Sequence, residues 1–145
     1  MSDYPDSLAM MFVFDIDNFK KINDTMGHAF GDEVLRSLGM QIGANFRVTD
    51  IIGRTGGDEF TIFLKNLQKD ENILREARKL EVFFKNFQVG EYVKYSATAS
   101  IGVAVFPADG SDFDTLYKAA DQALYMAKKR GKNQLAFFND KYRKE

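Results

Sequence analysis

Residues 51–64 read IIGRTGGDEFTIFL, with one short apolar segment on each side of a double glycine. From Phe60 to Leu64 the side chains alternate with the period of two that a β-strand requires. Gly56-Gly57 lacks Cβ atoms, so the backbone between the two segments can turn tightly. The stretch therefore predicts a β-hairpin that holds Asp58-Glu59 at the start of its second strand.

Three further segments are predicted to be strands. Leu8–Phe14 is a seven-residue apolar run that stops at Asp15, which is typical of a strand buried on both faces. Tyr95–Phe106 is the longest candidate, and Gln134–Phe138 fits a final edge strand. Because a tight hairpin joins antiparallel strands, the sheet is expected to be mixed and largely antiparallel.

Three segments place apolar residues at the spacing that one face of a helix requires. The first spans Val34–Phe46 and the second Ile73–Phe87, while the third begins near Ser111 or Asp112 and ends at Gly131. Helices alternating with strands around one central sheet indicate an α/β (α+β) sandwich, flanked by helices on its faces. No repeat or linker is found, so residues 1–145 are expected to form a single domain.

The composition excludes several classes of protein. A chain of 145 residues that is 45% hydrophobic and 28% charged suits one folded core rather than a disordered segment. The sequence has no cysteine, which excludes disulfides, thiolate zinc sites and thiol chemistry. A net charge of -1 gives no general attraction to nucleic acid or anionic lipid, so neither partner is expected.

The charges are nevertheless distributed unevenly along the chain. Residues 1–33 carry seven acidic and two basic side chains, whereas residues 128–145 carry seven basic and two acidic ones. If the fold brings these segments together, acids and bases would share one site. Such a site suits a polyanion chelated to a metal ion.

Two acidic clusters are candidates for metal binding. Asp15-Ile16-Asp17 follows the first strand, where sheet proteins commonly place ligand groups, and Asp58-Glu59 follows the double glycine. Carboxylate oxygens suit hard cations such as Mg²⁺. The alternative is that each acidic pair only solvates a turn. If the hairpin pairs beside the first strand, Asp15 and Asp58 can ligate the same ion.

Four motifs occur in the order found in the GGDEF family of diguanylate cyclases, which this chain resembles from Phe12 to Phe138. Residues 56–60 are GGDEF, and residues 14–32 resemble the family's D-x-D-x-F-K-x-I-N-D-x-x-G-H-x-x-G-D segment. Residues 100–104 match its S-I-G-V-A strand, and residues 120–133 resemble its A-D-x-A-L-Y-x-A-K-x-x-G-x-N helix.

This resemblance implies an enzyme that condenses two GTP molecules into cyclic di-GMP and two pyrophosphates. The fold is expected to be similar to nucleotidyl cyclases and polymerase palms. Mg²⁺ is the implied cofactor, and Mn²⁺ accepts the same oxygen ligands. One nucleotide site and two substrates imply a homodimer. A cytoplasmic location is implied. Because the chain lacks the family's preceding D-x-L-T-x-L-x-N-R segment and any sensory module, it is expected to be the catalytic core of a longer protein, including one anchored in a membrane.

The resemblance also assigns roles around the metal. Asp15 and Asp58 are expected to hold it through their side chains and Ile16 through its carbonyl oxygen. Glu59 is a further carboxylate at the metal, and Asp58 is the candidate base for the 3′-hydroxyl.

Substrate contacts are implied for a second set of residues. Asn23 and Asp32 match positions that read guanine, whose paired donors suit a carboxylate; adenine would leave a buried Asp32 unpaired. His28 matches a substrate-contacting position, with a structural hydrogen bond as the alternative. The triphosphate is expected at the backbone amides of Phe19 and Lys20 and the side chains of Lys20, Lys128 and Lys132. Cations at a helix end that complement its dipole are the alternative for the last two.

A product-binding site and two rival functions complete the expectations. Arg47 and Asp50 match the family's R-x-x-D inhibitory site, where cyclic di-GMP slows the enzyme, and Arg78 or Lys79 is expected to add a contact.

One rival function is that of a catalytically silent receptor that binds cyclic di-GMP through Arg47 and Asp50. The other is a GTP-binding interaction module without turnover.

Overall fold

The computed structural model describes residues 7–46, 51–54, 57–90 and 95–142. Its main sheet has the strand order β2-β3-β1-β6-β7, and a two-stranded sheet pairs β4 with β5. Only the β6–β7 pairing is parallel, so the prediction of a mixed, largely antiparallel sheet is confirmed. The strands are β1 (Leu8–Ile16), β2 (Ile51–Arg54), β3 (Glu59–Leu67), β4 (Gln88–Val89), β5 (Tyr95–Ser96), β6 (Ala99–Phe106) and β7 (Gln134–Phe137).

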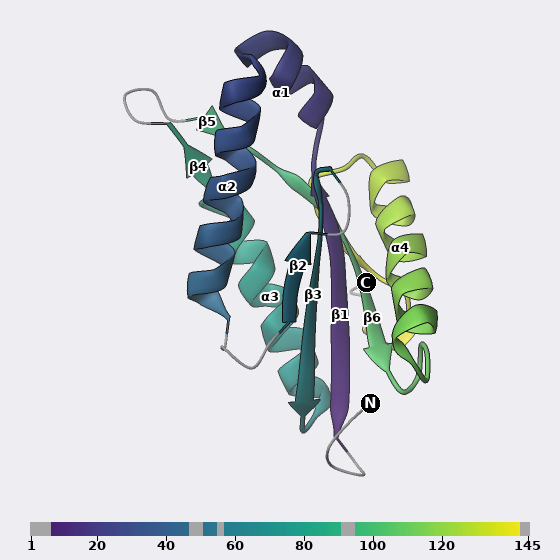
Figure 1. Cartoon of the computed structure of the whole chain (residues 1–145). Helices are drawn as coiled ribbons and strands as arrows, with labels where there is room; N and C mark the ends of the chain where they lie inside the picture. The colour runs from purple at the N-terminus through teal and green to yellow at the C-terminus, as the bar shows by residue number, and fades with distance from the viewer. Residues whose placement is uncertain (1–6, 47–50, 55–56, 91–94, 143–145) are drawn as a thin grey trace.

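Helices cover both faces of the main sheet, as the sandwich prediction requires (Figure 1). Helix α4 packs on one face, and helices α2 and α3 pack on the other. None of the helices within the described ranges is long and apolar enough to cross a membrane. The helices are α1 (Phe19–Met26), α2 (His28–Asn45), α3 (Asp70–Lys85) and α4 (Phe113–Lys129), followed by a 3-10 turn at Asp140–Tyr142.

The central strand β1 explains why its sequence is a continuous apolar run. Met10, Phe12 and Phe14 belong to the core under α2 and α3. The alternate residues Met11 and Val13 belong to the core under α4. Because successive side chains of a strand point to opposite faces, a strand covered on both sides needs apolar residues throughout. By the same alternation, Asp15 lies on the α4 face of the sheet.

Three features differ from the predicted elements. Helix α1 was not predicted: Phe19, Ile22 and Met26 share one face, but the helix is only eight residues long and Ile22 is its one buried residue. The expected long strand is interrupted at Ala97-Thr98, between β5 and β6. Phe87 lies just beyond the end of α3, although it is buried in the same core as that helix.

Candidate functional site

The two acidic clusters meet where β1 ends and β3 begins. Asp15 pairs directly with Glu59 across the two strands, and Asp58 is the residue before Glu59. Directly opposed residues in antiparallel strands have Cα atoms about 4.5–5.5 Å apart and project from the same face. Asp15 and Glu59 therefore lie side by side on the α4 face.

A cavity of about 520 Å³ opens beside these acids. Its lining combines the end of β1, the start of α1, Asp58 just before β3, the last turn of α4 and the turn that follows α4. Acidic residues from the N-terminal segment thus face basic residues from the C-terminal segment, as the uneven charge distribution suggested. The predicted site residues in this lining are Asp15, Ile16, Phe19, Lys20, Asp58, Lys128 and Lys132.

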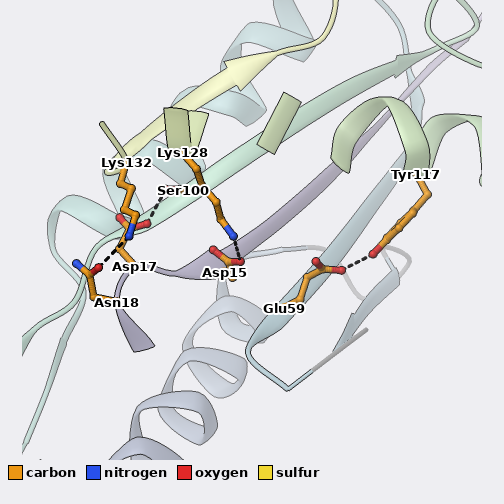
Figure 2. Close-up of polar contacts among 8 residues, drawn as sticks. All are labelled: Asp15, Asp17, Asn18, Glu59, Ser100, Tyr117, Lys128 and Lys132. Carbon is orange, nitrogen blue, oxygen red and sulfur yellow. Dashed lines mark hydrogen bonds and ion pairs between the residues drawn. The ribbon is translucent and has the colours of Figure 1, made fainter. Parts of the chain in front are cut away.

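Lys128 forms an ion pair with Asp15 in this cavity (Figure 2). Its Nζ lies 2.6 Å from Asp15 Oδ2. Burial raises the pKa of Asp15, and the negative charge of Asp58 adds to that effect, while Lys128 opposes it. Burial alone would lower the pKa of Lys128, but the bond to Asp15 and the charges of Asp58 and Glu59 outweigh it and raise that pKa. The ammonium group thus balances a local excess of negative charge.

The predicted metal ligands Asp15 and Glu59 are both engaged by other side chains. Across the described part of the chain, no three His, Cys, Asp or Glu side chains are arranged to hold a metal ion. Asp15 is engaged by Lys128, and Glu59 accepts a hydrogen bond from Tyr117 (Figure 2). The oxygen donors themselves fit a hard cation, and their excess negative charge attracts one. A cation at Asp15 therefore either shares the carboxylate with Lys128 or displaces Lys128 from it.

Asp17 corrects the interpretation of Asp15-Ile16-Asp17 as a cluster of ligands. Its Oδ1 accepts a hydrogen bond from Ser100 Oγ at 2.5 Å. Its Oδ2 accepts from Thr98 Oγ1 at 2.7 Å and from the backbone amide of Asn133 at 2.9 Å. A buried carboxylate with both oxygens satisfied by protein donors serves the fold. Asp17 ties the end of β1 to the start of β6 and to the turn after α4.

The turn after α4 places Lys132 at the cavity. Lys132 and Asn133 both adopt the left-handed backbone conformation, with φ of 63° and 50°. The bond from the Asn133 amide to Asp17 helps to hold this strained turn. Lys132 Nζ then donates to Asn18 Oδ1 at 2.9 Å (Figure 2). Lys128 thus reaches the cavity from the last turn of α4, and Lys132 reaches it from the turn that follows.

The expected guanine contacts lie on α1 and α2. A Cβ atom on Gly31 would overlap Asn23 Oδ1, so the Asn23 amide lies against α2 immediately beside Asp32. Within the described residues, Asn23, His28 and Asp32 stand outside the lining of the 520 Å³ cavity. Asp32 is exposed, which corrects the expectation of a buried carboxylate. Strong rejection of adenine then requires the bound base itself to cover Asp32.

The expected product-binding residues Arg47 and Asp50 lie outside the described residues. Arg78 lines a second cavity, of about 730 Å³, between α2 and α3. Lys79 lines the same cavity, and its Nζ lies 4.5 Å from the centroid of the Phe46 ring. Phe46, which Lys79 contacts, directly precedes Arg47 in the sequence.

The sequence reasoning did not identify Tyr117, Asn18, Lys21 or Asp24. Asn18, Lys21 and Asp24 line the main cavity, and Tyr117 contacts Glu59. Tyr117 precedes Lys128 by eleven residues, which is about three turns of helix and returns to the same face. The prediction of Lys128 as a site residue could therefore have pointed to Tyr117.

Comparisons with known proteins agree with these motifs. The family model described as "Diguanylate cyclase, GGDEF domain" matches residues 2–134. Over 142 residues, the chain is 36% identical to the diguanylate cyclase TpbB of Pseudomonas aeruginosa strain UCBPP-PA14, covering 96% of the chain and 32% of TpbB. It is also 36% identical over 124 residues to the cyclic di-GMP phosphodiesterase PdeR of Escherichia coli K12, covering 86% of the chain and 19% of PdeR. The chain thus spans a third or less of these relatives.

Solved structures share the fold. An EAL/GGDEF domain protein from M. capsulatus superposes with a TM-score of 0.83 at 38% identity, covering 95% of this chain and 88% of that one. The GGDEF domain of DgcB from Caulobacter crescentus, solved in complex with c-di-GMP, gives a TM-score of 0.78 at 28% identity, covering 91% and 78%.

Proposed function

This chain belongs to the GGDEF family, and on that basis we propose that it is a diguanylate cyclase domain that converts two GTP molecules into cyclic di-GMP and two pyrophosphates. One observation carries the proposal beyond membership of the family. Strand pairing sets Asp15 beside Glu59, and Asp15 and Asp58 line a cavity that four lysines border. Carboxylates for a cation and lysines for phosphates are what a nucleoside triphosphate bound with a metal requires.

The chain offers a set of oxygen donors for Mg²⁺ or Mn²⁺. The carboxylates of Asp15, Asp58 and Glu59 and the carbonyl of Ile16 would hold the ion. When bound, such an ion polarises the α-phosphate and offsets the charge of the leaving pyrophosphate. Lys128 then exchanges its ion pair with Asp15 for the phosphates, beside Lys20 and Lys132.

A second GTP molecule supplies the attacking 3′-hydroxyl group, and Asp58 acts as its base. The 3′-oxygen of one GTP attacks the α-phosphorus of the other, and the bond to pyrophosphate breaks. Asp58 takes the proton of the 3′-hydroxyl. Because the described residues form one such cavity, two copies would face each other to form both bonds. Because the substrate is GTP, we place the reaction in the cytoplasm. An attached sensor would control the reaction by controlling dimerisation.

We expect replacement of Asp32 with alanine to reduce the preference for GTP over ATP. A hydrogen bond to a charged group contributes roughly 1.5–3 kcal/mol, so the selectivity ratio should fall about 10- to 100-fold. The measurement is kcat/KM for both nucleotides, with E33A, an exchange of the neighbouring carboxylate, as the control. Unaltered selectivity in the Asp32 variant would move the guanine contact elsewhere.

We also propose that cyclic di-GMP inhibits the enzyme at Arg47 and Asp50, with Arg78 as an additional contact. Arg78 lines the second cavity next to Lys79, whose Nζ lies over the ring of Phe46, and this supports the arrangement. Replacing Arg47 with alanine should raise the product concentration needed for half-inhibition by about tenfold or more, through loss of a charged hydrogen-bond donor. The initial rate should persist. An unchanged inhibition curve would show that these residues only pair with each other.

A catalytically silent domain is the second candidate. The similarity to PdeR, which is named as a phosphodiesterase, favours it, as does the engagement of Asp15 by Lys128. The test incubates the purified chain, alone and as an artificially dimerised fusion, with GTP and Mg²⁺. Formation of cyclic di-GMP supports the cyclase. Binding of cyclic di-GMP without turnover would support a receptor, and binding of GTP alone an interaction module.

A further inference from the structure

Tyr117 of α4 reaches across to Glu59, the first residue of β3. Its hydroxyl donates a hydrogen bond to Glu59 Oε1, and the pair is partly buried (Figure 2). The two residues are 58 positions apart in the sequence, so the contact depends on the packing of α4 against the sheet. Asp15 is the strand neighbour of Glu59, which sets this contact within the cluster of acids.

The ring of Tyr117 is held by an aromatic row that starts on β3. Phe113 stacks on Tyr117 with centroids 6.4 Å apart and an interplanar angle of 17°. Phe113 in turn contacts Phe63 of β3 edge-on, with centroids 6.4 Å apart. Phe63 and Glu59 lie on the same strand, four residues apart, and therefore on the same face. The strand that carries Glu59 thus also helps to aim the hydroxyl at it.

A carboxylate already held by a hydrogen bond loses less rotamer entropy on binding a metal ion than a free carboxylate does. Ordering a free glutamate side chain costs rotamer entropy, because it has several rotatable bonds. A donor that engages one carboxylate oxygen sets the direction in which the other oxygen points. Groups that orient a metal ligand in this way commonly change metal affinity or activity by about 10- to 100-fold when they are removed.

We propose that Tyr117 is a positioning residue that orients Glu59 for the metal ion bound with GTP. The inference rests on the proposed function, because it assigns Glu59 to that ion. It adds a residue that lies outside the four motifs, on the opposite end of α4 from Lys128. Through these two residues a single helix contacts both Asp15 and Glu59.

The test replaces Tyr117 with phenylalanine, which removes the hydroxyl and keeps the ring. Mn²⁺ binding is measured by electron paramagnetic resonance in the presence of a non-hydrolysable GTP analogue. We expect the dissociation constant for Mn²⁺ to rise about 10- to 100-fold. We also expect a matching rise in the Mg²⁺ concentration needed for half-maximal activity, with the KM for GTP at saturating metal changing less than about twofold.

Tyr142→Phe is the matched control. Its hydroxyl also donates to a carboxylate, Asp70 Oδ1 at 2.7 Å, and its ring also stacks on a phenylalanine, Phe137. Asp70 lies at the start of α3 and is not among the described residues that line the 520 Å³ cavity. The control should leave Mn²⁺ affinity unchanged while losing a comparable hydrogen bond. A general effect of tyrosine removal would appear in both variants.

A double variant identifies the group through which Tyr117 acts. In an E59Q background, adding Y117F should weaken Mn²⁺ binding by much less than it does in the unaltered chain. An equal loss in both backgrounds, or unchanged or tighter Mn²⁺ binding by the single variant, would overturn the positioning role. Failure of the unaltered chain to bind Mn²⁺ with the analogue would instead overturn the proposed function itself.

Discussion

Replacing Asp58 with alanine should abolish measurable formation of cyclic di-GMP, with a loss on the order of 10²–10⁴-fold or more from the base function alone. The same carboxylate is a proposed ligand of the metal ion, so both contributions disappear together. Asp58 lines the main cavity, and its charge acts on Asp15 and Lys128.

The measurement is the initial rate of product formation by the dimerised protein with saturating GTP and Mg²⁺. Asp114→Ala is the control, because Asp114 is an exposed carboxylate in the first turn of α4. Asp58→Asn should also be inactive, since an amide keeps the shape but accepts no proton. Normal turnover by either Asp58 variant would refute the assigned role.

The largest effect on stability is expected at Gly102 of β6. A Cβ atom there would overlap the carbonyl oxygen of Ala120 and the amide nitrogen of Leu124, both backbone atoms of α4. Backbone atoms cannot rotate away, so α4 must shift from the sheet. Overpacking typically costs about 1–3 kcal/mol, and we expect Gly102→Ala to lower the free energy of unfolding by about 3 kcal/mol or more. Urea denaturation measures this change.

Gly43→Ala provides the opposite case for comparison. Gly43 lies inside α2, and a Cβ atom there would meet nothing within 4 Å. Alanine at that position should raise the free energy of unfolding by about 0.5–1 kcal/mol, because glycine is the poorer helix former. If Gly102→Ala destabilised the protein no more than Gly43→Ala does, α4 would not lie as close to β6 as the structure shows. Lys128 and Tyr117 would then not be placed to contact Asp15 and Glu59.

The elements that the sequence predicted well are those with a strong apolar pattern. The run in β1, the alternation in β3 and the stripes in α2, α3 and α4 each correspond to a buried face. Helix α1 has the pattern only over eight residues and buries only Ile22, which is too short a stripe to predict a helix from. The pairing of β1 with β3 could be anticipated only as a condition, since periodicity does not specify which strands are neighbours.

At the site, sequence patterns located the acids but did not separate their roles. Asp15 and Asp17 look equivalent in the sequence, yet Asp15 faces the cavity and Lys128 whereas Asp17 is saturated by Ser100, Thr98 and Asn133. The difference comes from donors located more than eighty residues away, which no local pattern can reveal. The roles proposed for the guanine-contacting and product-binding residues stay predictions.

The most direct test is a crystal structure of the chain with Mn²⁺ and a non-hydrolysable GTP analogue, using the anomalous signal of the metal. The account predicts a Mn²⁺ peak in contact with carboxylate oxygens of Asp15 and Asp58, at the roughly 2.0–2.2 Å typical of small divalent ions. Lys128 should have left Asp15 for the phosphates. A nucleotide bound with its metal elsewhere, while Lys128 stays paired with Asp15, would contradict it.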